Sequence, residues 1–250
     1  MKPALAFREP QFPSTWQALP NGEIIRKTIE LTLAPWWQKF FGYHLVKLGA
    51  LSCEINSVGS TIKHQINLST NHLGSDVIAD IDDLPLQAQS VDVCLLSHVL
   101  EFSIDPHHVV REANRILIPN GYLVITGFNP LSLAGLNRFI PYRRQNTPWD
   151  AHFFSPLRIK DWLHLMGFEI ITDQRFLPTS LTGKLSEQSL TSPWHNFANR
   201  YLTTFGSVYI IIAKKRVLPL TPVKPIWQIQ TSFEPVKAAS LRSQQSKTKG

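Results

Sequence analysis

The feature that most constrains the fold is the segment Val91–Leu96, which is apolar at nearly every position. A strand of this kind is typical of a parallel sheet whose two faces are both covered by helices. Further apolar strand-like segments lie on both sides of it along the chain, and helical patterns separate several of them. We therefore expect an α/β domain with a mostly parallel sheet and helices on both faces.

Two helices of this domain have clear start signals. Asp105-Pro106 and Ser155-Pro156 each combine a favoured N-cap residue with proline at the first helical position. The triplet Pro119-Asn120-Gly121 predicts the end of the first helix, and Gly167 predicts the C-cap of the second. Besides 91–96, the expected strands are the short apolar segments 43–48, 61–68, 75–79, 122–128, 168–172 and 207–213.

The chain divides into three expected parts, residues 1–42, 43–216 and 217–250. The first is a helical extension whose aromatic residues either pack a helix on the sheet or form a lid over a ligand. These residues are Trp16, Trp36, Trp37, Phe40, Phe41 and Tyr43. The middle part is the α/β domain, and the last part is a tail.

The charge distribution sets the tail apart. The chain has 25 Lys and Arg against 18 Asp and Glu, a formal net charge of +7. From Lys214 onward there are eight basic residues and one acidic residue, so the whole excess lies there. Four prolines and a polar end predict that the tail is unfolded. It is either an arm for an acidic partner, such as RNA or an anionic surface, or a solubilising appendage.

Several other classes are excluded by pattern. No apolar run approaches the roughly 18–20 residues that cross a bilayer, and the first residues lack the apolar core of a secretory signal. The cysteines, Cys53 and Cys94, make neither a disulfide framework nor a zinc set, and no metal-ligand spacing is present. We expect a cytoplasmic protein without a metal site, in which Cys94 is a buried apolar residue.

The segment Ala79–Pro130 carries a series of short motifs in a fixed order. An acid before Leu-Pro is followed by Ser-Val-Asp-Val, Val-Leu-Glu, Asp-Pro, Arg-Glu-Ala-Asn-Arg-Ile-Leu and Pro-Asn-Gly. This series resembles the type 11 branch of the class I S-adenosylmethionine-dependent methyltransferases. The resemblance implies a Rossmann-like fold, with a C-terminal antiparallel strand and, here, an N-terminal helical extension. It gives Asp92, in the strand opening, a structural role.

The resemblance also implies S-adenosylmethionine as methyl donor, bound across the carboxyl ends of the first four strands. Asp80, with Ile81, matches the position that contacts adenine; the alternative is that Asp80 is a helix N-cap or a loop acid. Asn67 matches the acid that binds the ribose hydroxyls. Ser97 and His98 match the wall near the methionine part and the acceptor. His98 is the one candidate base, with a satisfied polar residue at a strand end as the alternative.

The glycine-rich turn of the family is altered in this chain. The pattern (D/E)xGxGxG falls on Lys47, Gly49, Leu51 and Cys53, so that only the first glycine is kept. Glycines there let the backbone approach the cofactor, and a leucine would occupy that space unless the turn is rebuilt. Lys47 is either a surface lysine of a lost site or a partner for the methionine carboxylate in a rearranged pocket.

Two functions follow from these observations. The resemblance implies methyl transfer to an unidentified acceptor, small molecule or macromolecule, in which the protein mainly positions the reactants. The altered turn favours the alternative of a catalytically silent binding or scaffold protein with the same fold. Arg138, Arg143 and Arg144, after the fifth strand, either attract an anionic acceptor or form a solvated basic helix end.

Overall fold

The computed structural model describes residues 12–70, 74–137, 148–179, 181 and 205–217. The expected tail, apart from Val217, lies outside these residues, as do Arg138, Arg143 and Arg144. Among the described residues, no helix is both long and apolar enough to span a bilayer.

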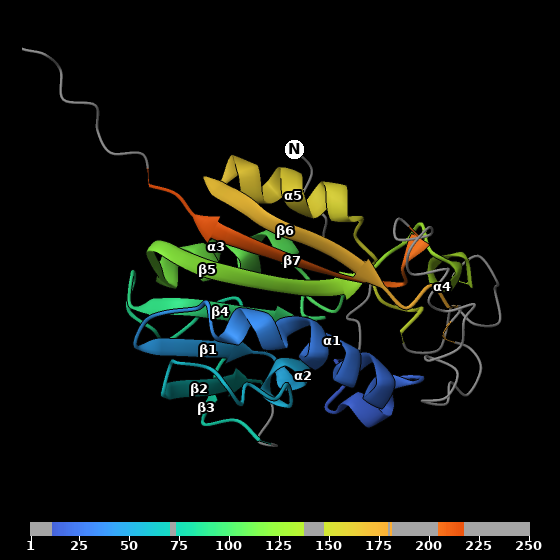
Figure 1. The fold of residues 1–250 in the computed structure, drawn as a ribbon, viewed down its shortest axis with the longest axis horizontal. Helices are drawn as coiled ribbons and strands as arrows, with labels where there is room; N and C mark the ends of the chain where they lie inside the picture. Colours follow the sequence, from blue (N-terminus) through green and yellow to red (C-terminus); the bar gives the residue numbers. More distant parts are fainter. Residues whose placement is uncertain (1–11, 71–73, 138–147, 180, 182–204, 218–250) are drawn as a thin grey trace, which may run out of the picture. The chain divides into compact units, whose positions relative to one another are not determined.

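The described residues form a seven-stranded sheet with the order β3-β2-β1-β4-β5-β7-β6 (Figure 1). Strands β1 to β5 pair in parallel, and β7 runs antiparallel to both of its neighbours, β5 and β6. This confirms the expected fold class. The strands are β1 (His44–Leu48), β2 (His64–Ser69), β3 (Val77–Ile78), β4 (Val91–Ser97), β5 (Leu117–Phe128), β6 (Phe168–Phe176) and β7 (Val208–Lys215).

Helices cover both faces of the sheet (Figure 1). Helix α1 packs on one face together with the short 3-10 helix η1, and α3 and α5 pack on the other. The helices are η1 (Trp16–Ala18), α1 (Gly22–Trp37), α2 (Ala50–Cys53), α3 (Pro106–Ile116), α4 (Leu133–Leu136) and α5 (Pro156–Leu165).

Strand β4 explains why its sequence is apolar throughout. Val93 and Leu95 belong to the core under α1, whereas Cys94 and Leu96 belong to the core under α3 and α5. Successive side chains of a strand point to opposite faces, so a strand covered on both faces has no polar side. The expectation that Cys94 is a buried apolar residue is confirmed.

The predicted caps form as expected. The Asp105 side chain accepts a hydrogen bond from the His108 backbone N–H at 3.1 Å, and Pro106 begins α3. The Ser155 hydroxyl does the same for the Arg158 N–H at 3.3 Å at the start of α5. These bonds satisfy backbone donors that the first turn of a helix leaves free.

Some boundaries differ from the expectation. The triplet 119–121 does not separate α3 from a later strand, because β5 begins at Leu117 and passes through the triplet with a register shift opposite β4. Asn120 there has a φ of 66°, so a turn-like residue is absorbed as an irregularity within the strand. Strand β6 extends to Phe176, past the expected end at 172, while β3 is shorter than 75–79.

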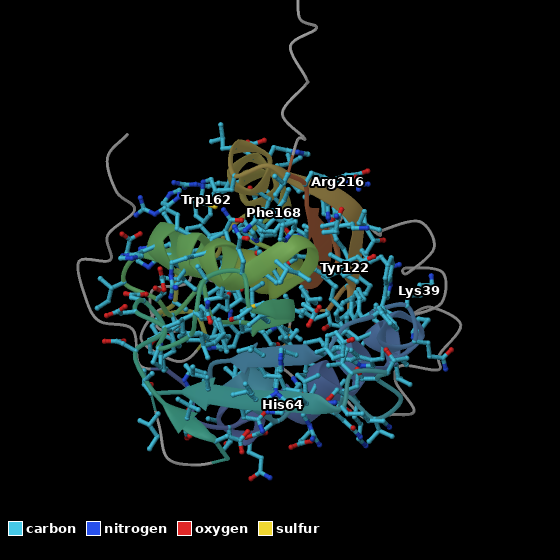
Figure 2. All side chains as sticks on the ribbon, turned by 90° about the vertical axis from the view of Figure 1, so that its left-hand side faces the viewer. Lys39, His64, Tyr122, Trp162, Phe168 and Arg216 are labelled. Atoms are coloured by element: carbon cyan, nitrogen blue, oxygen red, sulfur yellow. The ribbon has the colours of Figure 1, made fainter. Side chains whose placement is uncertain are left out.

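The N-terminal aromatic residues divide into two groups. Trp16, Trp37 and Phe40 are buried in the core under α1, and the half-buried Trp36 packs against it, which supports packing for these four. Phe41 and Tyr43 are 85% and 79% exposed and take no part in that core. Figure 2 looks onto the end of the sheet near them, where the parallel strands begin and where His64 starts β2.

Candidate functional site

The turn after β1 begins with Gly49, and any other residue at this position would force the neighbouring side chains to move. Gly49 has a φ of +85°, which is unfavourable for side chains. A Cβ atom on it would lie 2.8 Å from Cγ2 of Val99 and 3.8 Å from Cδ1 of Ile81. The retained glycine of the family pattern therefore keeps the backbone close to the segments that follow β3 and β4.

The other two glycine positions are rebuilt as a helical turn, α2. The Leu51 side chain is buried, and its carbonyl accepts a hydrogen bond of 2.9 Å from the indole Nε1 of Trp16. The Ser52 hydroxyl accepts a hydrogen bond of 2.7 Å from the Ser97 N–H. Burial raises the pKa of the neighbouring Cys53 thiol to about 11. The N-terminal extension has thus become a structural part of this turn.

Lys47 is not a surface lysine, so that interpretation is wrong. Its side chain is buried at 6% exposure, and its Nζ donates a hydrogen bond of 2.8 Å to the carbonyl of Ile55. Burial lowers the pKa of the Lys47 ammonium, and the charges of Cys53, Glu30 and Asp76 oppose this only in part. This hydrogen bond joins the segment after α2 to β1.

Asn67 lies beside Lys47 in the sheet, near the carboxyl end of β2. Its backbone N–H donates to the Asp76 carboxylate, and its carbonyl accepts from the Asp76 N–H, both at 2.8 Å. Its side-chain Oδ1 is buried and has no hydrogen-bond partner among the described residues. The sequence analysis did not identify Asp76, because nothing in the local pattern shows that it folds back onto Asn67.

Asp80 and Ile81 lie just past the end of β3. Asp80 is exposed, and its backbone carbonyl accepts a hydrogen bond of 3.3 Å from the Asp83 N–H. Asp80 therefore lies in a turn at the surface. Ile81 is buried next to Gly49. Burial, followed by the charge of Asp80, raises the pKa of the neighbouring Asp82 carboxyl.

Ser97 is fully buried within the sheet. Its hydroxyl forms a hydrogen bond of 2.8 Å with the Thr126 hydroxyl of β5, and its N–H is bonded to the Ser52 hydroxyl. The structure therefore places Ser97 as a link between β4, β5 and α2. Its side chain is already engaged by these neighbours.

His98 follows Ser97 in a left-handed backbone conformation, with a φ of 53°. Its ring is fully buried between the aromatic rings of Trp16 and Phe128, whose centroids lie 5.5 Å and 4.2 Å away. Neither ring nitrogen has a hydrogen-bond partner among the described residues. Its Nδ1 lies 3.5 Å from Oε1 of Glu101. His98 is thus not the satisfied polar residue that was the alternative.

Glu101 is a residue that the sequence analysis did not single out. It is 1% exposed, and its Oε1 accepts a hydrogen bond of 2.7 Å from the Phe128 N–H, while Oε2 has no partner among the described residues. A Cβ on Gly127 would lie 2.5 Å from this Oε1 and 2.4 Å from the Tyr209 hydroxyl. Burial raises the pKa of the Tyr209 phenol, and the charge of Glu101 adds to this. Glycine at 127 thus makes room for two buried polar groups.

These residues lie at one end of the sheet, where its parallel strands have their carboxyl ends. Buried polar atoms in folded proteins are nearly always hydrogen-bonded. Here Asn67, His98 and Glu101 each keep at least one buried atom that has no hydrogen bond to any described residue. An imidazole next to a buried carboxylate is suited to accepting a proton. Among the described residues, no group of three or more His, Cys, Asp and Glu side chains is placed to hold a metal ion.

Comparison with known proteins supports the fold and the family. A family model described as a methyltransferase domain matches residues 48–125. The uncharacterized protein YafS of Escherichia coli (strain K12) is 39% identical over 225 residues, which cover 88% of each chain.

Solved structures share the fold at lower identity. A SAM-dependent methyltransferase from Archaeoglobus fulgidus is 21% identical with a TM-score of 0.54, covering 76% of this chain and 94% of its own. An S-adenosylmethionine-dependent methyltransferase from Mesorhizobium loti is 16% identical with a TM-score of 0.51, covering 80% and 100%. With the motifs of residues 79–130 and the strand order, these matches lead to one conclusion: the chain belongs to the class I S-adenosylmethionine-dependent methyltransferases, in the type 11 branch.

Proposed function

We propose that this protein binds S-adenosylmethionine at the carboxyl edge of its sheet and transfers the methyl group to an acceptor that is brought next to His98. The observation that carries the proposal concerns buried polar atoms of Asn67, His98 and Glu101 at this end of the sheet, which have no hydrogen-bond partner within the described part of the chain. Such atoms destabilise a fold unless a ligand or a proton uses them. Their position agrees with the rule that open α/β sheets bind ligands outside the carboxyl ends of their strands.

The nucleoside end of the cofactor fits the residues present. Gly49 holds the turn close to the segments that follow β3 and β4. The Oδ1 of Asn67, which has no hydrogen-bond partner among the described residues, is assigned to a ribose hydroxyl, and the apolar Ile81 to the adenine ring. Asp80 is exposed beside Ile81 and is assigned to the adenine amino group. At the methionine end, Lys47 supplies a buried cation close to the turn, although its Nζ is now bonded to Ile55.

The chain's own residues then determine what happens to the acceptor. The cofactor supplies an electrophilic methyl group, and the protein holds the acceptor's nucleophile in line with it. We assign His98 as the group that accepts a proton from the nucleophile. Glu101 is the positioning residue, because its carboxylate lies 3.5 Å from Nδ1 of His98 and is itself fixed by the Phe128 N–H. A carboxylate in this place can fix the orientation of the imidazole ring.

Isothermal titration of the full chain with S-adenosylmethionine and S-adenosylhomocysteine tests the proposal. We expect micromolar binding, and a loss of about tenfold or more for Asn67→Ala and Asp80→Ala, since each removes a hydrogen bond to the nucleoside. Asp83→Ala is the matched control, an exposed acid of the same turn, and should bind like the unchanged protein. A folded protein that binds neither ligand would contradict the proposal.

One observation favours the second candidate, a catalytically silent protein of the same fold. The turn that is glycine-rich in the family holds the buried Leu51 and the half-buried Cys53 here, and the Trp16 indole donates a hydrogen bond to the carbonyl of Leu51. A silent protein would leave both ligands unbound in the titration. The same measurement therefore separates the two candidates.

A further inference from the structure

Two histidines face each other where the parallel strands begin, at the end of the sheet opposite to the candidate site. His44 begins β1 and His64 begins β2, and they are direct partners in the parallel pairing of these strands. Their Nδ1 atoms lie 2.9 Å apart, and their ring centroids are 4.8 Å apart with the planes at 86°. Figure 2 labels His64 at this end of the sheet. Sequence spacing does not reveal the pair, because 20 positions separate the two residues.

The sheet fixes the backbone that carries the two rings. The His44 N–H donates a hydrogen bond of 2.8 Å to Oδ2 of Asp92, near the start of β4. Strand β1 lies between β2 and β4 and pairs with both. Ligands on the strands of a sheet are held more precisely than ligands on loops. The two rings are therefore a preorganised pair whose side chains still reach solvent, since His64 is exposed and His44 is half-buried.

The contact between the rings requires that one of the two Nδ1 atoms carries no proton. A neutral imidazole has a proton on one ring nitrogen and a lone pair on the other. At 2.9 Å, one Nδ1 donates its proton to the lone pair of the second Nδ1. When that proton moves through solvent to the Nε2 of its own ring, two Nδ1 lone pairs are left beside each other. Neutral imidazole is the commonest metal ligand among side chains.

The distance between the two nitrogens selects the kind of metal ion. Bonds from a metal to an imidazole nitrogen are about 2.0–2.1 Å long, so nitrogens 2.9 Å apart subtend an angle of about 90° at the metal. This is the angle between neighbouring ligands in square-planar and tetragonal sites, the geometries of Cu²⁺ and Ni²⁺. A tetrahedral Zn²⁺ site needs nitrogens about 3.3 Å apart. The described residues contain no group of three or more His, Cys, Asp and Glu that could hold an ion, so water takes the remaining positions.

We propose that His44 and His64 together bind one Cu²⁺ ion through their Nδ1 atoms. Rotation of the two rings about their side-chain bonds turns both lone pairs toward the metal, while the strands stay in place. Cu²⁺ is the divalent ion of its row that nitrogen ligands bind most tightly. Gly49 and His98 lie past the other ends of β1 and β4. The proposal therefore goes beyond methyl transfer and does not depend on it.

Isothermal titration of the full chain, free of any added histidine tag, with CuCl₂ and with NiCl₂ tests the proposal. Ni²⁺ is the second probe because the free thiols of Cys53 and Cys94 do not reduce it. The variants His44→Gln and His64→Gln each remove one ligand and keep a polar side chain. His164→Gln is the matched control, because His164 is an exposed histidine on α5. Circular dichroism checks that all variants are folded.

We expect the unchanged protein and the control variant to bind Cu²⁺ more tightly than Ni²⁺. Each ligand variant should bind both ions about tenfold more weakly or less, because the loss of one imidazole also removes the chelate. Electron paramagnetic resonance of the copper complex should show coupling to two imidazole nitrogens in the unchanged protein and to fewer in each ligand variant. Bound Ni²⁺ should raise the Tm of the unchanged protein but not of the ligand variants.

Equal binding of Cu²⁺ by the unchanged protein and the two ligand variants would overturn the proposal and place the ion on other residues. The resonance measurement needs no variant, and a copper complex of the unchanged protein without coupling to two imidazole nitrogens would also contradict the proposal. All variants should bind S-adenosylhomocysteine like the unchanged protein. A failure of the metal site and a failure of the proposed function are therefore read separately.

Discussion

The two ends of β4 each lie beside a buried acid, and the two carboxylates are held in different ways. Asp92, where the strand begins, accepts hydrogen bonds of 2.8 Å from the backbone N–H groups of both Tyr43 and His44. Glu101, past the end of the strand, accepts one from Phe128 and keeps an oxygen without a partner among the described residues. Asp92 lies at the start of β4, at the end of the sheet where the parallel strands begin.

The difference distinguishes an acid that stabilises the fold from the acid that the proposed function assigns as a positioning residue. A carboxylate with two backbone donors stabilises the structure that positions them. A buried carboxylate with an unpaired oxygen destabilises the fold, and such groups persist where function requires them. The structural role that the family resemblance gave to Asp92 agrees with its contacts.

The largest change in the free energy of unfolding is expected for a substitution of Asp92. Asp92→Ala removes the acceptor of two backbone donors at a buried position, so it should lower the free energy of unfolding by about 3 kcal/mol. Urea unfolding followed by circular dichroism measures this. Asp161→Ala, an exposed acid on α5, should leave the value nearly unchanged. A loss at Asp92 no greater than at Asp161 would remove the distinction between the two ends of the sheet.

The next largest effect is a pH dependence of the free energy of unfolding, caused by Cys53 in the turn after β1. The pKa of the Cys53 thiol is raised from 9.0 to about 11 in the folded protein. The stability that the neutral thiol contributes is therefore fully present below pH 9 and is lost as the pH rises through about 11. The unchanged protein should lose up to about 2 kcal/mol more than Cys53→Ala over this range, after allowance for partial exposure.

Unfolding of both proteins by urea at pH 8 and pH 11 measures the Cys53 effect. All other groups that ionise in this range, Cys94 included, are common to the two proteins and cancel in the difference. The same pH dependence in both proteins would show that the thiol of Cys53 is already solvated in the folded state.

A smaller effect is expected at Glu101. Glu101→Gln keeps an oxygen for the Phe128 N–H and removes a buried negative charge, so the free energy of unfolding should change by less than about 1 kcal/mol or increase. The matched change Asp92→Asn weakens two charge-assisted hydrogen bonds and should cost about 1–2 kcal/mol. Calorimetry on the two amide variants compares them directly. A greater loss of unfolding free energy for Glu101→Gln than for Asp92→Asn would mean that Glu101, and not Asp92, is the acid that stabilises the fold.

The smallest change in the free energy of unfolding is expected for an exposed ion pair at the sheet. Arg216 forms an ion pair with Glu169, and both side chains are 50% exposed. Pairs of this kind contribute little, so Arg216→Ala should change the free energy of unfolding by about 0.5 kcal/mol or less. The change should also shrink in 1 M salt, which screens exposed charges. A salt-independent loss would mean that packing of the arginine matters instead.

Much of the fold could be predicted because its signals are local. The caps at Asp105 and Ser155 act on backbone groups within one turn, and the apolar run of β4 follows from burial on both faces. The irregular start of β5 could not be predicted in the same way. Its triplet 119–121 has the local preference of a turn, and pairing with β4 overrides that preference.

The site was less predictable because its contacts join distant parts of the sequence. Gly49 was found from the glycine-rich pattern of the family, and the region after β4 from the motif series. The contact of Trp16 with Leu51 spans 35 positions, and that of Glu101 with Phe128 spans 27. Glu101 stood in the recognised Val-Leu-Glu motif, but a motif does not show which of its side chains are buried without a partner.

The hydrogen bond between the Trp16 indole and the Leu51 carbonyl has a consequence for the altered turn. Because the acceptor is a backbone carbonyl, the bond does not depend on which side chain stands at position 51. Replacing Leu51 by glycine would therefore keep the bond and lose only the packing of a buried leucine. The N-terminal extension would stay attached to the turn even if the turn regained its second glycine.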